Sequence, residues 1–182
     1  MGKRIRRELT RKFIFRDLNI MEKNQPLVGI ILGSKSDWDT IKITADTLEL
    51  LDIPFEVNAL SAHRNPAHVH EYATTAKSRG LKVIVAAAGM AAALPGVVAA
   101  LTPIPVLGVP IQTPVMGGID SLLSMVQMPG GIPVGTLAIG KAGAKNAALM
   151  SASIIALSNV QIAESLDEFR KKQNENIAEI SL

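Results

Sequence analysis

The stretch LVGIILGSKSD, residues 27–37, decides the fold class. Its first six residues form a short, β-branched apolar run that ends at Gly33, which is typical of a buried strand. Ser36 or Asp37 can then cap a helix, because their side-chain oxygens accept hydrogen bonds from the free N–H groups of a first turn. Apolar side chains follow at a spacing near 3.6 residues, so the pattern predicts a strand that leads directly into a helix.

This strand-and-helix unit recurs along the chain. The expected strands cover residues 27–32, 55–60, 83–88, 105–109 and 134–139. The expected helices are one that carries apolar residues between 41 and 51, then 65–79, one from near Pro95, 119–126, 142–157, and a terminal amphipathic helix marked by Ile162, Leu166 and Phe169. Apolar strands that each precede a helix predict a parallel sheet covered on both faces. We therefore expect an α/β fold: a three-layer, doubly wound, five-stranded sheet of flavodoxin-like order 2-1-3-4-5 with an extra C-terminal helix.

Composition excludes several classes of protein. The 182 residues include no cysteine, which rules out disulfides, thiolate nucleophiles and cysteine-ligated metals. Hydrophobic residues make up 48% of the chain, as expected for a globular protein. Aromatic residues make up only 3%, too few for a platform on which single-stranded nucleic acid stacks. Gly, Pro and polar residues interrupt every long apolar run, so we expect no membrane span.

Positive charge is concentrated at the N-terminus. Residues 1–20 hold seven Lys and Arg against two acidic residues, a net +5, so a total of +3 leaves −2 for the rest of the chain. We expect residues 1–25 to be a flexible basic extension and residues 26–182 to form a single domain, with no nucleic-acid footprint on it. The arginine-rich start is also a feature of organelle transit peptides, although Glu8 and Asp17 count against one. Met21 offers an alternative start.

Ligands of doubly wound sheets bind outside the carboxyl ends of the strands, so the loops there are the first to inspect. Gly33 permits a tight turn after the first strand. The serines at 34 and 36 and the free N–H groups of the next helix form a natural phosphate cradle. Asp37 is placed to hold ribose hydroxyls. An ordinary capped turn explains the same residues equally well.

The loop after the second strand contains Ser61, His63 and Arg64. The planar guanidinium of Arg64 suits a phosphate. His63 is a candidate general acid and base, because the ordinary pKa of histidine lies near neutrality. A surface histidine beside a solvated arginine is the alternative. His68 and His70 are two residues apart on a predicted helix and point to different faces, so we expect no metal site there.

Together these loops resemble the catalytic subunit of phosphoribosylaminoimidazole carboxylase, a family that in bacteria acts as carboxyaminoimidazole ribonucleotide mutase. The matching pieces are GSKSDW (33–38), SAHRNP (61–66), ALPG (93–96), PVLGVP (105–110), DSLLSMVQMP (120–129) and GIPVGTLAIGKAGAKNAAL (131–149). The likeness covers residues 28–157. The animal-type carboxylase branch has lysine where this chain has Arg64, so the mutase branch is favoured.

The resemblance implies an isomerase of de novo purine biosynthesis. It would move a carboxylate from the exocyclic nitrogen of aminoimidazole ribonucleotide to a ring carbon, with His63 donating and then accepting a proton. The Gly89 backbone would line the base and the migrating carboxylate. No metal, nucleotide or flavin cofactor is implied. The family further implies a cytoplasmic homo-octamer, coupled in function to the ATP-dependent synthetase that makes the carbamate substrate.

The resemblance also assigns the binding residues. Ser34 and Arg64 would bind the phosphate, with Ser36 and Ser61 nearby, and Asp37 would hold the ribose. A direct aminoimidazole ribonucleotide carboxylase that uses carbon dioxide is an alternative function.

Three residues depart from the family pattern. Ala93 stands where the family has histidine, and Met90 and Ala87 stand where glycine is common. These departures leave an inactive homologue as another alternative. A flavin-binding module of the same fold is a further one, but an FMN site usually needs aromatic cover, and the chain has only Trp38 and Tyr72 in addition to four phenylalanines.

Overall fold

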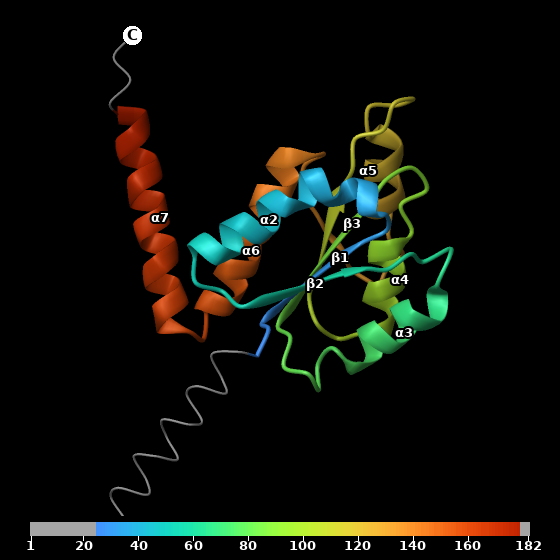
Figure 1. Ribbon diagram of the computed structural model, residues 1–182, viewed down its shortest axis with the longest axis horizontal. Coiled ribbons are helices and arrows are strands. Elements are labelled where there is room, and N and C mark those ends of the chain that lie inside the picture. Colours follow the sequence, from blue (N-terminus) through green and yellow to red (C-terminus); the bar gives the residue numbers. More distant parts are fainter. Residues whose placement is uncertain (1–24, 179–182) are drawn as a thin grey trace, which may run out of the picture.

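The apolar runs of the sequence form the centre of one sheet (Figure 1). This structure, a computed structural model, describes residues 25–178, and the expected basic extension lies outside the described residues except for Gln25. The strands are β1 (Val28–Leu32), β2 (Phe55–Ala59), β3 (Val83–Ala88), β4 (Val106–Pro110) and β5 (Gly135–Thr136). All neighbours pair in parallel in the order β2-β1-β3-β4-β5, which confirms the predicted fold class.

Helices cover both faces of this sheet. They are the 3-10 turn η1 (Lys35–Asp37), α2 (Trp38–Leu50), α3 (Pro66–Thr75), α4 (Leu94–Leu101), α5 (Ile119–Val126), α6 (Lys141–Ala156) and α7 (Val160–Ala178). Two buried clusters fill the spaces between the layers. One joins α2, α6 and the start of α7 to the sheet, and the other joins α3, α4 and α5 to the opposite face. β1 and β3 are buried throughout, as central strands of a three-layer fold must be.

The pairing of α2 with α6 depends on small residues and one buried hydroxyl. Thr44 of α2 is fully buried and donates a hydrogen bond of 2.8 Å to the carbonyl of Ala144 on α6. Gly143 brings the first turn of α6 against the backbone of Ala138, where a Cβ has no room. Trp38 begins α2 and packs, partly buried, against the same cluster.

Two elements are shorter than the sequence predicts. β5 was expected over residues 134–139 but forms a ladder only over Gly135–Thr136. The chain still follows β4 beyond that point, because Leu137 and Gly140 donate backbone hydrogen bonds to Gly108 and Pro110. The chain there bends away from regular pairing and turns into α6. The expected helix over 65–79 ends as α3 at Thr75, and turns continue it to residue 80.

The described residues contain no helix of the length and apolar character that crossing a membrane requires.

Candidate functional site

Three loops meet at one edge of the sheet, because β2, β1 and β3 are neighbours and run in the same direction. They are residues 33–37 after β1, 60–65 after β2 and 89–93 after β3. Backbone hydrogen bonds fix where each loop leaves the sheet: Gly33 donates to the Ala87 carbonyl at 3.1 Å, and Leu60 donates to the Leu32 carbonyl at 2.9 Å. The predicted phosphate cradle and the predicted histidine–arginine loop are therefore side by side.

Hydroxyl groups line the first loop. Ser34, in extended backbone, caps η1 by accepting a hydrogen bond from the Ser36 N–H at 3.4 Å. The Ser36 hydroxyl lies 2.8 Å from Ser34 Oγ and 3.3 Å from Asp37 Oδ1. The prediction that Ser36 or Asp37 provides the cap is wrong. Asp37 holds the N-cap position of α2 but makes no capping bond, because the 3-10 turn inserted before α2 takes Ser34 as its cap.

Burial raises the pKa of the Asp37 carboxyl. Hydrogen bonds from Ser36 and from the Ser34 backbone, together with the charge of Arg64, act in the opposite direction but do not cancel it. The carboxylate is therefore poorly solvated, which is the condition under which ribose hydroxyls would compensate it best.

Arg64 links the second loop to the first. Its Nη2 donates to the Gly33 carbonyl at 2.7 Å, and its Nε and backbone N–H each donate to Ser61 Oγ at 3.3 Å. The guanidinium is thus fixed over the start of the phosphate cradle, and Nη1 remains for an anion. The structure brings Ser34, Ser36 and Arg64 together as the sequence predicted.

His63 stands at the tip of the second loop and is exposed. The residues that the structure describes make no hydrogen bond to its imidazole, so the ring is open to an incoming molecule. Sequence reasoning took Asn65 only as the start of a helix, but its Oδ1 accepts a 2.6 Å hydrogen bond from the Ser61 N–H. An asparagine before proline indicates the start of a helix, so the sequence does not announce this bond.

The third loop is built from small residues with one exception. Gly89 faces Ile111 and Thr113 of the loop after β4, at ordinary contact distances for a Cβ. Met90 has a φ of +57°, a left-handed conformation that favours glycine, and its side chain is 67% exposed. Its carbonyl accepts a 3.3 Å hydrogen bond from Ser124 of α5, a second residue that sequence reasoning missed.

The departures at positions 87 and 93 differ in their surroundings. Ala87 is fully buried in the cluster beneath α2 and α6, so its methyl group belongs to the core. Ala93 is half-buried directly before α4, within the third loop. Of the two, only Ala93 therefore stands at the candidate site.

Other candidate features lie elsewhere. His68 and His70 are both exposed on α3, and no group of three metal-binding side chains is found within residues 25–178.

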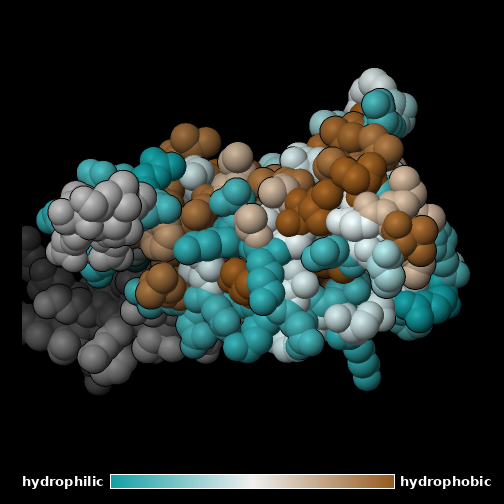
Figure 2. Space-filling view, turned by 90° about the horizontal axis from the view of Figure 1, so that it is seen from above, coloured by the Kyte–Doolittle hydropathy of each residue, from teal (hydrophilic) through white to brown (hydrophobic). Residues whose placement is uncertain are grey.

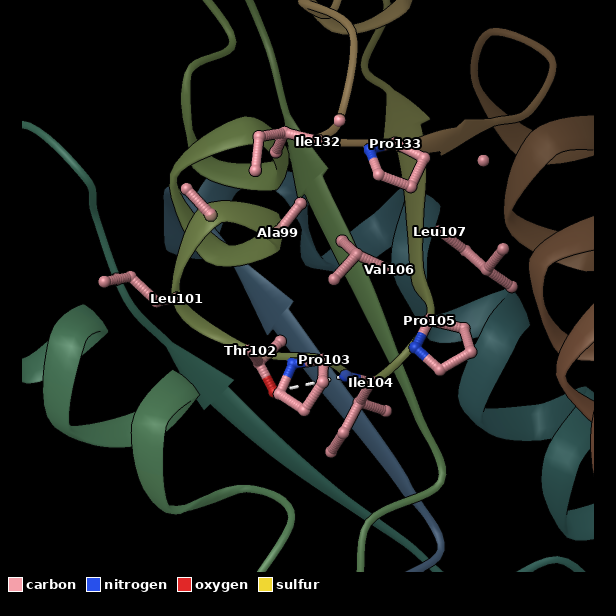
Figure 3. Close-up of a pocket in the computed structure, with 13 residues that line it drawn as sticks. Ala99, Leu101, Thr102, Pro103, Ile104, Pro105, Val106, Leu107, Ile132 and Pro133 are labelled. Carbon is pink, nitrogen blue, oxygen red and sulfur yellow. Dashed lines mark hydrogen bonds between the residues drawn. The ribbon is translucent and has the colours of Figure 1, made fainter.

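A cavity of about 710 Å³ opens at the amino end of β4, between residues 99–107 and 131–135 (Figure 3). It lies at the opposite end of the strands from the three loops. Thr102 supplies the one polar side chain of its lining, and the other polar groups there belong to the backbone. The ionisable and hydroxyl side chains of the candidate site belong to the three loops and not to this cavity.

Curated proteins match most of the length of this chain. The bifunctional purine synthesis protein purC/E of Dictyostelium discoideum is 61% identical over 160 residues, which are 88% of this chain but only 16% of that protein. The N5-carboxyaminoimidazole ribonucleotide mutase of Pseudomonas aeruginosa is 58% identical and matches 83% of this chain and 93% of its own length. The mutase of Bacillus subtilis is 54% identical, with 86% and 97% covered.

A solved structure and a family match extend the comparison. The crystal structure of Treponema denticola PurE superposes with a TM-score of 0.77 at 28% identity, covering 85% of this chain and 95% of that one. The AIR carboxylase family matches residues 27–176, a span that contains all three loops. The chain belongs to the AIR carboxylase family.

Proposed function

We propose that this chain is a carboxyaminoimidazole ribonucleotide mutase of purine biosynthesis, an isomerase. It moves a carboxylate from the exocyclic nitrogen of aminoimidazole ribonucleotide to a ring carbon. The observation that carries this is the Arg64 bridge to Gly33, which joins the loop of His63 to the loop of Ser34 and Ser36 at one edge of the sheet. Relatives that carry the mutase name over nearly their whole length support it.

The ribose phosphate enters the first loop. Ser34 and Arg64 bind its phosphate, and Ser36 and Ser61 complete the polar surroundings. A helix start adds free N–H groups, which favour an anion. Asp37 accepts from the ribose hydroxyls. This arrangement aims the base toward the third loop, where the Gly89 backbone approaches it without a side chain in between.

His63 moves the proton. It donates to the exocyclic nitrogen as the carbamate loses carbon dioxide, and it removes the proton from the ring carbon after carbon dioxide has added there. One imidazole performs both steps, because the nitrogen that gives up the first proton is left with the lone pair that accepts the second. Carbon dioxide stays at the site between the two steps, so its escape and the entry of water must both be slow.

A direct carboxylase is the second candidate, and the name of the matching family favours it. Such an enzyme takes free carbon dioxide onto aminoimidazole ribonucleotide. Arg64 favours the mutase, since the animal-type carboxylase branch has lysine at this position. A third candidate is an inactive homologue that retains the fold, because Ala93 stands where the family has histidine.

We also propose a homo-octamer that works in the cytoplasm beside the synthetase that makes its carbamate substrate. Apolar side chains support an assembly: Figure 2 shows them gathered on the side where Figure 1 places α5. The exposed apolar residues there are Val115, Met116, Ile119, Leu123 and Val126. We propose that residues 1–20 are dispensable, so a chain that begins at Met21 keeps both activity and assembly. Loss of either would refute this.

Two assays run side by side test the function. The purified protein receives either the carbamate substrate or aminoimidazole ribonucleotide with bicarbonate, and ultraviolet absorbance follows the product. We expect turnover of the carbamate and a loss of about a hundredfold or more in His63→Asn. His68→Asn, an exposed histidine on α3, is the matched control. Turnover only with bicarbonate identifies a carboxylase, and no turnover with either identifies an inactive homologue.

A further inference from the structure

The turn that carries His63 is closed by a side chain that the proposed reaction does not otherwise use. Asn65 Oδ1 accepts from the Ser61 N–H at 2.6 Å, and the Asn65 N–H donates to the Ser61 carbonyl at 3.0 Å. The two bonds join the same pair of residues in opposite directions. They tie together the two ends of the turn, with His63 between them.

Asn65 makes this contact in place of the one that its position favours. It is the N-cap residue of α3, where an asparagine side chain normally accepts from a free N–H of the first turn. The structure shows no such capping bond, and the side chain is directed back to Ser61 instead. Helix stability therefore does not explain the orientation of this side chain, whereas closure of the turn does.

The two functional side chains of the turn depend on this closure to different degrees. Arg64 has its own anchors, the Ser61 hydroxyl and the Gly33 carbonyl. The His63 imidazole accepts or donates no hydrogen bond within residues 25–178, so the backbone of the turn alone determines where it stands. Opening the turn consequently displaces His63 more than Arg64.

We propose that Asn65 is a positioning residue of the reaction, which closes the 61–65 turn and so places the His63 imidazole for proton transfer. This rests on the proposed function. Proton transfer needs the two heavy atoms within hydrogen-bond reach, and a displacement of about 1 Å can lower a rate by about a hundredfold. The effect therefore falls on kcat more than on KM, since Arg64 keeps the phosphate in place.

Steady-state kinetics of the full chain test the proposal with four variants. Asn65→Ala removes the acceptor, and Asn65→Ser is too short to reach the Ser61 N–H but still caps a helix. Asn65→Asp keeps an oxygen at the same position. Asn159→Ala is the matched control, because Asn159 Oδ1 accepts from the Ile162 N–H at 3.1 Å at the start of α7.

The expected pattern is specific to positioning. Asn65→Ala and Asn65→Ser lose about tenfold or more in kcat, with KM changed by less than about threefold. Asn65→Asp recovers most of the loss, and Asn159→Ala retains full kcat. Should Asn65→Ala fail to fold, Asn65→Ser decides the matter. Normal kcat in Asn65→Ser, or an Asn65→Asp variant as slow as Asn65→Ala, would overturn the proposal.

Hydrogen exchange gives a second test that needs no turnover. Mass spectrometry of a peptide that covers residues 60–66 should show a protected Ser61 amide in the wild type and in Asn65→Asp, and faster exchange in Asn65→Ser. Unchanged exchange in Asn65→Ser overturns the proposal whatever the activity. A protected Ser61 amide in a wild type that has no mutase activity, with faster exchange in Asn65→Ser, refutes the proposed function instead and leaves Asn65 as the residue that fixes the turn.

Discussion

Replacing Arg64 by lysine tests phosphate binding most directly. The guanidinium uses Nε for Ser61 Oγ at 3.3 Å and Nη2 for the Gly33 carbonyl at 2.7 Å, which leaves Nη1 for a phosphate. The single ammonium group of lysine cannot serve all three partners in one plane. A hydrogen bond to a charged group contributes about 1.5–3 kcal/mol. At about 1.4 kcal/mol per factor of ten, its loss raises KM roughly 10- to 150-fold.

The measurement pairs kinetics with direct inhibition. KM for the carbamate substrate and competitive inhibition by ribose 5-phosphate are determined for wild type, Arg64→Lys and Arg79→Lys. Arg79 is the matched control, because it pairs with Glu56 at the amino ends of the strands. We expect inhibition to weaken in parallel with KM in Arg64→Lys only, with a smaller change in kcat. Unchanged KM and unchanged inhibition in Arg64→Lys would refute the assignment of Arg64 to the phosphate.

Three further changes have expected outcomes on stability. A Cβ at Gly143 would lie 2.6 Å from the carbonyl carbon of Ala138, so Gly143→Ala should lower the free energy of unfolding by about 2–3 kcal/mol. Gly96→Ala, also in a first helical turn but facing only a flexible methionine, should stay within about 1 kcal/mol of wild type; equal loss in both would contradict the packing argument. Burial raises the pKa of Asp37, so stability is lost as pH rises through that pKa. Asp37→Asn should therefore melt higher than wild type at neutral pH, with no gain at about pH 3, where the carboxyl is protonated; a gain that persists at low pH would count against this. Met90→Gly removes the strain of a left-handed φ of +57°. It should raise the free energy of unfolding, measured by chemical denaturation, by about 1 kcal/mol; no gain would mean that Met90 is not strained in the loop.

The sequence predicted the sheet because its signals are local. The apolar run of β1 is bounded by Gly33, and the run of β3 is apolar throughout. Both strands were therefore predicted within a residue of their observed ends. The length of β5 was overestimated, because an apolar run beside a neighbouring strand has the same sequence pattern whether or not it forms a regular ladder. Beyond Thr136, the backbone N–H groups of Leu137 and Gly140 bond to β4 without forming a regular ladder.

The residues of the candidate site were proposed from the sequence, but the contacts between its loops were not. Ser34, Ser36, Asp37, Ser61, His63 and Arg64 were all identified from loops at strand ends. The Arg64 bridge to Gly33 spans 31 residues, and the Ser124 bond to Met90 spans 34, so no local pattern announces either. Asn65 was hidden for another reason: its position fits a helix cap, and only the geometry shows that its side chain turns the other way.

Trp38 gives the chain a built-in optical probe. It is the single tryptophan, and it begins α2 immediately after the loop that holds Ser34 and Asp37. The intrinsic fluorescence of the protein therefore comes largely from one indole beside the proposed phosphate site. A dianion that settles in this loop changes the electric field at the ring, so the emission shifts without any attached dye. Titration with inorganic phosphate or a ribose phosphate can thus yield dissociation constants in variants that have lost all turnover, His63→Asn included.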